Sequence, residues 1–161
     1  MHDMLVKLYE LPSLTAALDA LSVRGIAVRR VLAPETPVVI DWVRTNFPAS
    51  VAEVGIACSR LPVSCFIAVR DERIQGFACH DATARNFFGP EAVAEELRGR
   101  GIGRALLLAA LHAQREQGYA YAIIGGVGPA DFYARCVGAI PIPGSTPGIY
   151  AGLLRPKSPA S

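Results

Sequence analysis

The spacing of apolar residues separates predicted strands from predicted helices along the first third of the chain. Residues 4–9 alternate as a short strand, and residues 12–21 carry leucines at helical intervals until Gly25 ends the helix. Residues 26–32 are rich in β-branched side chains and predict a second strand. Two helices then follow in succession, over residues 38–47 and 51–59.

The middle of the chain predicts antiparallel strands. Residues 63–69 and 74–82 read as a hairpin around the polar turn at residues 70–73. A third strand over residues 87–94 contains Gly89 and Pro90, and proline is tolerated in a strand chiefly at an edge or a bulge. We therefore expect the hydrogen-bonded ladder to break at this pair.

The second half alternates strands and helices. Gly101 and Gly103 lead into a long helix over residues 104–117, which Gly118 closes before a strand over residues 119–124. A glycine-rich segment then opens a short helix ending at Val137, and residues 149–154 predict a last strand. The whole pattern predicts a mixed α/β fold with a largely antiparallel first half.

Composition narrows the classes of function. The 161 residues suffice for one domain, and 52% are hydrophobic, which excludes intrinsic disorder for most of the chain. Only 19% are charged, against roughly 25% in an average soluble protein, which indicates a well-covered sheet or an apolar surface that faces a partner; a homodimer is compatible with the second. A net charge of +2 is too small for unspecific nucleic-acid binding, and we expect a small-molecule ligand.

Neither a membrane span nor a metal site is predicted. The apolar run at residues 105–111 is far shorter than the roughly 18 residues that cross a bilayer, and the N-terminus lacks a secretory pattern. We expect a cytoplasmic protein with no nucleic-acid or membrane partner. Four cysteines are scattered without a Cys-x-x-Cys pair, which favours buried, reduced thiols.

The segment from Arg98 to Gly103 has the strongest chemical signal. Its glycines allow close approach of the backbone to a ligand, and it precedes a long helix whose first N–H groups have no partner within the helix. The helix dipole and the side chains of Arg98, Arg100 and Arg104 add positive charge, so the segment predicts a pyrophosphate site. The alternative is a plain glycine turn. The segment fits neither the P-loop nor the dinucleotide pattern.

Arg98, Gly101 and Gly103 match Gln/Arg-x-x-Gly-x-Gly/Ala at a strand-to-helix turn. In this the chain resembles the Gcn5-related N-acetyltransferase (GNAT) superfamily, and Phe132 and Tyr133 in the later short helix are a second match. The order of elements resembles the family over residues 26–154, while the specific motifs lie between residues 93 and 138.

The resemblance implies a GNAT-type acyl-CoA N-acyltransferase fold, in which helices flank a mixed, mostly antiparallel, twisted sheet. Residues 26–154 would form the acetyltransferase domain. Residues 1–25 would be an additional N-terminal strand and helix, and residues 155–161 a flexible C-terminal tail.

The resemblance also implies a cosubstrate, acetyl-CoA, and the residues that bind it. Arg98 and the backbone N–H groups from Gly99 to Arg104 would hold its pyrophosphate; these residues are Gly99, Arg100, Gly101, Ile102, Gly103 and Arg104. Val93 and Ala94 would pair with the pantetheine arm through their backbone, and the break at Gly89 would make room for the thioester.

By the same resemblance, Tyr133 would be the general acid that protonates the leaving thiolate. A base must remove a proton from the attacking amine, and Glu91 is the candidate because it precedes Val93 by two positions on the same strand face, provided that the bulge keeps the register. The alternative interpretations are an interface or core tyrosine for Tyr133 and a solvated strand residue for Glu91.

In the family, the helices after the first strand form the acceptor wall, which here would include Trp42, Phe47 and Glu53. A wall with few carboxylates argues against a cationic peptide and favours a small metabolite amine, such as an amino sugar or amino acid.

The predicted function is an N-acetyltransferase that moves the acetyl group of acetyl-CoA to such an amine by direct attack. Two alternatives are a non-catalytic CoA-binding sensor or interaction module and an acetyltransferase acting on protein or peptide amines. A nucleotide-binding regulator is a further alternative, and it would prefer ATP or NAD over CoA.

Overall fold

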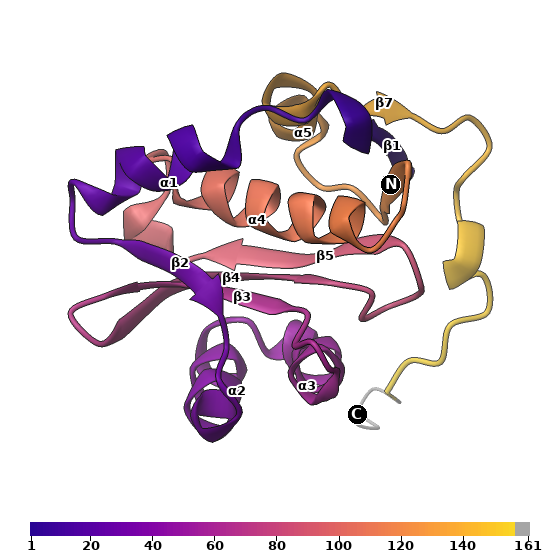
Figure 1. The fold of residues 1–161 in the computed structure, drawn as a ribbon. Coiled ribbons are helices and arrows are strands. Elements are labelled where there is room, and N and C mark those ends of the chain that lie inside the picture. Colours follow the sequence, from indigo (N-terminus) through magenta and orange to yellow (C-terminus); the bar gives the residue numbers. More distant parts are fainter. Residues whose placement is uncertain (157–161) are drawn as a thin grey trace.

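Seven strands form one sheet in the computed structural model, which describes residues 1–156 (Figure 1). The strands are β1 (Met4–Lys7), β2 (Ala27–Arg30), β3 (Cys65–Arg70), β4 (Arg73–His80), β5 (Phe87–Val93), β6 (Tyr121–Ile124) and β7 (Ile140–Pro141). Their order is β2-β3-β4-β5-β6-β1-β7. Every neighbouring pair is antiparallel except β5 and β6, so the predicted mixed, mostly antiparallel sheet is confirmed.

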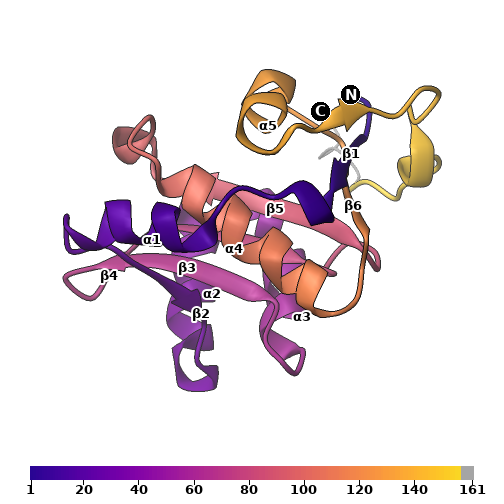
Figure 2. The same cartoon turned by 45° about the horizontal axis from the view of Figure 1, so that its top comes forward.

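Helices cover both faces of the sheet. On one face, α1 (Leu14–Ser22) and α4 (Ile102–Glu116) run side by side, and α5 (Ala130–Val137) contributes to the same apolar core (Figure 2). On the other face, α2 (Thr36–Asn46) and α3 (Val51–Ser59) enclose a second core against β3 and β4. The sequence predicted all five of these helices.

Helix α4 is the central support of the first core. Its leucines and alanines are buried, including Leu106, Leu107, Leu108 and Leu111, because the sheet lies beneath it and α1 lies beside it. Gly101 is the N-cap residue before the first turn of the helix, and its φ of +85° is one that residues other than glycine adopt only with strain. The N-terminus of α4 therefore follows directly from the glycine segment after β5.

Strand β1 lies inside the sheet. It pairs with β6 through Met4 and Ile124, and with β7 on its other side through Met4 and Pro141. Met4 and Val6 are buried in the core that α4 covers. The N-terminal strand and helix thus share a core with the rest of the chain, although the sequence boundaries of the acetyltransferase domain remain a prediction.

The predicted break in the third strand of the middle region is confirmed. Two residues of β5 lie between Phe88 and Glu91, whereas only one residue of β4 lies between their partners, so β5 bulges there by one residue. The bulge includes Gly89, which has a φ of +114°. The parallel ladder to β6 contains only Phe87 and Phe88. Beyond Phe88 no strand lies along this edge of β5 in the described part of the chain, so the two strands separate there.

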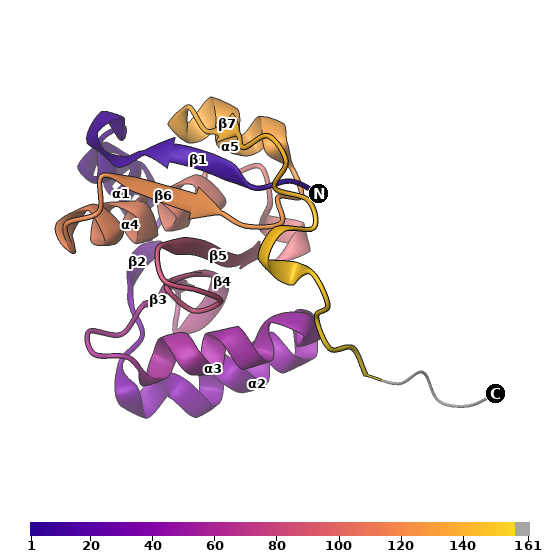
Figure 3. The same cartoon turned by 90° about the vertical axis from the view of Figure 1, so that its right-hand side faces the viewer.

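The predicted last strand over residues 149–154 is wrong. The segment after β7 instead runs toward the level of α3 without forming a strand, and it contains a 3-10 turn at Gly148–Tyr150 (Figure 3). Tyr150 packs on the glycine loop after β6, where its Oη lies 2.6 Å from the position that a Cβ on Gly125 would take. The backbone here forms hydrogen bonds within local turns instead of across a ladder, since the Tyr150 N–H donates to the Pro147 carbonyl and the Ala151 N–H to the Gly148 carbonyl. Of the predicted tail, residues 155 and 156 are exposed and 157–161 lie outside the described residues.

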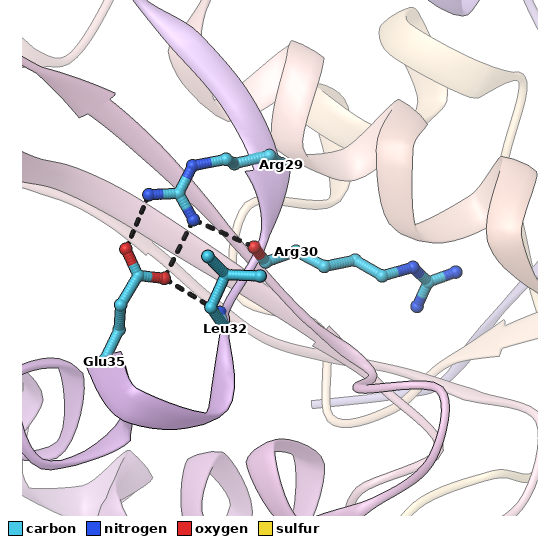
Figure 4. A network of polar contacts seen from close by, with 4 residues as sticks. All are labelled: Arg29, Arg30, Leu32 and Glu35. Atoms are coloured by element: carbon cyan, nitrogen blue, oxygen red, sulfur yellow. Dashed lines mark hydrogen bonds and ion pairs between the residues drawn. The ribbon is translucent and has the colours of Figure 1, made fainter.

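A polar network fixes the entry to α2 (Figure 4). The Arg29 guanidinium donates two hydrogen bonds to the Glu35 carboxylate, at 2.6 and 2.8 Å, and the Leu32 N–H donates to Glu35 Oε2 at 2.8 Å. These donors lower the pKa of Glu35 to about 2. The network ties the end of β2 to the helix whose far end delivers Phe47 to the site described next.

Among residues 1–156, no helix has the length and apolar character needed to cross a membrane.

Candidate active site

A cavity of about 570 Å³ lies where β5 separates from β6. It extends from the glycine segment at the N-terminus of α4, across the open edge of β5, to Phe47 at the end of α2. Helix α5 closes it on the remaining side. The lining residues are Phe47, Glu91, Ala92, Val93, Leu97, Arg98, Gly99, Gly101, Gly103, Arg104, Pro129, Phe132 and Tyr133.

The glycine segment presents a row of free donors to this cavity. The first bond of α4 runs from the Ala105 N–H to the Gly101 carbonyl, at 3.1 Å. Within the described structure, none of the six backbone N–H groups from Gly99 to Arg104 donates to a protein acceptor. Gly99 and Gly101 have φ values of +74° and +85°, which curve the segment so that its amides can converge. Six such donors at a helix N-terminus can bind a polyanion.

The arginines of the segment have no acidic partner. No carboxylate in residues 1–156 forms an ion pair with Arg98, Arg100 or Arg104. The Arg98 Nε donates to the Val93 carbonyl at 3.2 Å, which holds that side chain against the end of β5. The positive charge around the loop is therefore available to an anion.

Glu91 and Tyr133 meet inside the cavity. Tyr133 Oη lies 3.5 Å from Glu91 Oε2, at the limit of a hydrogen bond, and Oε1 of the same carboxyl is buried with no partner among the described groups. Burial raises the pKa of Glu91 to about 8, although the Tyr133 hydroxyl opposes the shift. Burial and the nearby Glu91 also raise the pKa of Tyr133, which keeps its proton at neutral pH. The pair combines a base that titrates near neutrality with a hydroxyl that remains a donor.

The two residues predicted to pair with the pantetheine arm differ in their availability. The Ala94 N–H donates to Gln75 across the sheet, and the Ala94 carbonyl accepts from the Leu97 N–H, both at 2.9 Å. Because backbone direction alternates along a strand, Val93 has its N–H and carbonyl on the open edge. Val93 is therefore the one with backbone groups toward the cavity, and its N–H is the available group because its carbonyl accepts from Arg98 Nε.

The remaining residues predicted to bind the cosubstrate are Arg100 and Ile102. Arg100 is exposed beside the cavity, while the Ile102 side chain is buried in the core, so only its N–H can serve a ligand.

Of the predicted acceptor residues, Phe47 alone lines the cavity. Trp42 packs behind it, with ring centroids 5.6 Å apart, and lines a neighbouring hollow. Glu53 lies on α3 and accepts a hydrogen bond from Thr83 Oγ1 outside the cavity lining. Trp42 therefore supports the wall and Glu53 lies beyond it.

Four lining residues were not predicted from the sequence: Ala92, Leu97, Pro129 and Phe132. Phe132 packs edge-on against Tyr133 at 5.1 Å between centroids, and its place beside Tyr133 in the second motif was the available signal. A Cβ on Gly103 would lie 3.5 to 3.6 Å from Glu91 Oε1, Phe132 and Val93, so glycine keeps this part of the cavity open.

A histidine–aspartate pair and the cysteines are titratable groups that lie outside the cavity lining. His80 and Asp81 form a buried pair, with Nδ1 and Oδ2 2.7 Å apart, away from the cavity lining. Cys58, Cys65 and Cys79 are free and buried, whereas Cys136 is half-buried. In the part of the chain that the structure describes, no group of His, Cys, Asp and Glu residues could hold a metal ion.

Comparison with known families agrees with this geometry. Residues 62–136, from β3 to α5, match the acetyltransferase (GNAT) domain. The chain resembles the GNAT family over this segment. The matched segment contains β4, β5, the glycine loop, α4 and Tyr133, so most of the cavity wall lies within the part of the chain that matches the family.

Solved structures extend the likeness in fold over most of the chain. A region of a fungal multi-domain GH3 β-N-acetylglucosaminidase, described as a GCN5-related glucosamine N-acetyltransferase region, superposes with a TM-score of 0.72 at 17% identity and covers 88% of this chain. A GCN5-related N-acetyltransferase from Sphaerobacter thermophilus gives 0.63 at 19% identity, and a Drosophila protein gives 0.59 at 12%, each over 88% of this chain.

This chain spans only part of those proteins: 19% of the fungal enzyme, 48% of the Sphaerobacter protein and 47% of the Drosophila protein. No curated protein matches the chain.

Proposed function

We propose that this protein is an N-acetyltransferase that transfers the acetyl group of acetyl-CoA to a primary amine of a small metabolite by direct attack. The observation that carries the proposal is one cavity that joins a row of unpartnered backbone donors to a buried carboxyl–hydroxyl pair. The first feature can bind a pyrophosphate, and the second can move protons.

The residues present fit acetyl-CoA. The six free N–H groups from Gly99 to Arg104 would hold the pyrophosphate, with Arg98 and Arg104 beside them. The Val93 N–H would pair with the pantetheine arm, while the Val93 carbonyl accepts from Arg98 Nε. When bound, acetyl-CoA supplies the activated acetyl group. The cavity at Gly103, which a side chain would partly fill, leaves room for it next to Glu91.

Glu91 would accept the proton of the incoming ammonium group. Its carboxyl has an unpartnered Oε1 in the cavity, and a pKa of about 8 lies between neutral pH and the pKa of an alkylamine near 10. A carboxyl with an ordinary pKa near 4 would be a much weaker base for this purpose. Burial thus makes Glu91 suitable for proton transfer.

Tyr133 would hold a proton at Oη and donate it to the leaving thiolate. Its raised pKa keeps the hydroxyl protonated, and packing between Phe88 and Phe132 fixes the ring in place. Because Tyr133 also contacts Glu91, the two residues would act as one proton-transferring unit.

The walls favour a small amine over a basic peptide. Glu91 is the one acidic residue lining the cavity, and Phe47 closes the acceptor end with an aromatic ring. A lysine-rich peptide would need an acidic groove to offset its charge. Amino sugars and amino acids remain the acceptor classes that we propose.

Calorimetry tests the proposal directly. The wild-type chain is titrated with acetyl-CoA, CoA, ATP and NAD, and thiol release is then followed over a panel of amines that begins with glucosamine and includes a lysine-rich peptide. Micromolar binding of acetyl-CoA together with amine-dependent thiol release is the expected result. Binding without release on any amine would instead indicate a CoA sensor, and a preference for ATP or NAD a nucleotide-binding regulator.

A further inference from the structure

A side chain from the N-terminal segment contacts the glycine loop. Arg24 follows α1, and its Nη1 donates a 2.6 Å hydrogen bond to the backbone carbonyl of Arg100. The two residues are 76 positions apart in sequence. This bond connects a segment outside the matched GNAT region to the middle of the predicted pyrophosphate loop.

Backbone hydrogen bonds fix the turn that carries Arg24. Its own N–H donates to the Leu21 carbonyl at 2.9 Å, and the Ile26 N–H donates to the same carbonyl at 3.1 Å. Leu21 is buried in the core beneath α4. The turn that carries Arg24 is therefore fixed relative to the helix whose N-terminus begins at the loop.

The contact is not an ordinary ion pair. Arg24 and Arg100 have the same charge, and no carboxylate within residues 1–156 forms an ion pair with Arg24. What Arg24 binds is a peptide carbonyl, so its effect is on the orientation of the backbone.

Orientation of that carbonyl sets the direction of a donor. In a planar trans peptide, the carbonyl of one residue and the N–H of the next point in opposite directions. The Arg100 carbonyl and the Gly101 N–H belong to the same peptide unit, and Gly101 lines the cavity. In the described structure no other hydrogen bond holds this unit, and Gly101 has no side chain that would limit its rotation.

We propose that Arg24 is a positioning residue for the cosubstrate: by binding the Arg100 carbonyl outside the cavity, it holds the Gly101 N–H toward the pyrophosphate. The inference rests on the proposed function, because it assumes that this loop binds acetyl-CoA. It assigns the N-terminal segment a part in binding as well as in the sheet.

The test compares three variants of the full chain. R24M removes the donor, R24K keeps one, and R115M removes the same charge from an exposed position at the other end of α4. Dissociation constants for acetyl-CoA are measured by calorimetry, and kcat and both KM values on the best amine are measured in the same buffer.

We expect R24M to raise both the dissociation constant and the KM for acetyl-CoA about fivefold, as for loss of one charge-assisted hydrogen bond at a partly exposed site. R24K should stay within about twofold of wild type because it keeps a charged donor, and R115M because the net contributions of exposed charges are small. The kcat, the KM for the amine and the melting temperature should not change in any of the three.

Two results would overturn the inference alone: R24M binding acetyl-CoA like wild type, or R115M weakening binding as much as R24M, which would reduce the effect to net charge. Failure of the wild-type chain to bind acetyl-CoA would overturn the proposed function and this inference together.

Discussion

Burial raises the pKa of Glu91, and the position of this residue in the sequence does not by itself reveal that burial. An exposed glutamate titrates near pH 4, but here the carboxyl is enclosed between the open edge of β5 and α5, and its pKa rises to about 8. The sequence placed Glu91 on the correct strand, where a solvated side chain was the competing interpretation. Its enclosure depends on α5, which follows 39 positions later in the chain and could not be placed from local pattern.

Substitution of Glu91 tests its role as a base. In the wild type, kcat/KM should rise with pH through about 8, because only the carboxylate form accepts a proton. Glu91→Gln should lower kcat/KM by about 10²-fold or more and remove that limb of the profile. Titration of the amine itself would remain. A Glu91→Gln variant with the wild-type profile would exclude Glu91 as the titrating group.

The same residue should limit stability. The pKa of Glu91 is higher in the folded than in the unfolded chain. The contribution of this carboxyl to the free energy of unfolding is therefore fully present below about pH 4.5 and is lost as pH rises through about 8. Glu91→Gln should therefore raise the melting temperature at pH 8.5 by ~5 °C or more, with little gain at pH 4.5. Calorimetric melting at the two pH values checks this, with Glu95→Gln, an exposed position, as the matched control.

Tyr133→Phe separates an enzyme from a sensor. Loss of the hydroxyl should lower kcat about 10²-fold, since a positioned general acid contributes at least that much, while calorimetry should give an unchanged dissociation constant for acetyl-CoA. The Phe ring keeps the packing against Phe88 and Phe132. Equal turnover in the variant and the wild type would show that another group donates the proton.

Individual elements were predicted well where their pattern is local. The five helices and the strands of the middle region follow from periodicity, because the apolar residues that each element buries recur at regular spacing within its own sequence. Strand β7 was missed, since two residues carry no period, and the strand predicted at residues 149–154 became a turn around Gly148. The position of β1 between β6 and β7 depends on pairing between opposite ends of the chain.

Two glycines in regular elements should respond oppositely to alanine. A Cβ on Gly76 in β4 would lie 2.8 Å from the Ala92 carbonyl oxygen of the next strand, so Gly76→Ala should destabilise the fold by about 1–3 kcal/mol. A Cβ on Gly55 in α3 meets only the tip of Ile40, at 3.9 Å. Gly55→Ala should stabilise the fold by about 0.5–1 kcal/mol through helix propensity. Urea unfolding of both variants provides the comparison, and equal shifts would contradict the packing argument.

At the scale of the whole molecule, the candidate site depends on parts that lie far apart in sequence. The loop after β5, the pair formed by Glu91 and Tyr133, and Phe47 all face one cavity. The sequence motifs indicated the loop and Tyr133. They could not indicate that Phe47 reaches the cavity while Glu53 does not, because that depends on how α2 and α3 pack across the sheet.

Removal of residues 1–25 tests whether the N-terminal segment is a separable addition. The shortened chain would lack β1 between β6 and β7 and would expose the core that Met4 and Val6 cover. We expect it to lose cooperative thermal unfolding and dispersed amide resonances. A shortened chain that unfolds cooperatively near the wild-type temperature would instead support an independent domain beginning at residue 26.

The pairing of Met4 with Ile124 has a consequence for biosynthesis. Strand β1 must wait for β6, which is translated about 120 residues later and at 5–20 residues per second takes roughly ten seconds to follow. During that interval the apolar side chains of β1 have no partner strand, and this part of the sheet cannot close. A chaperone that shields nascent β1 should therefore raise the yield of active protein more than one that acts after release.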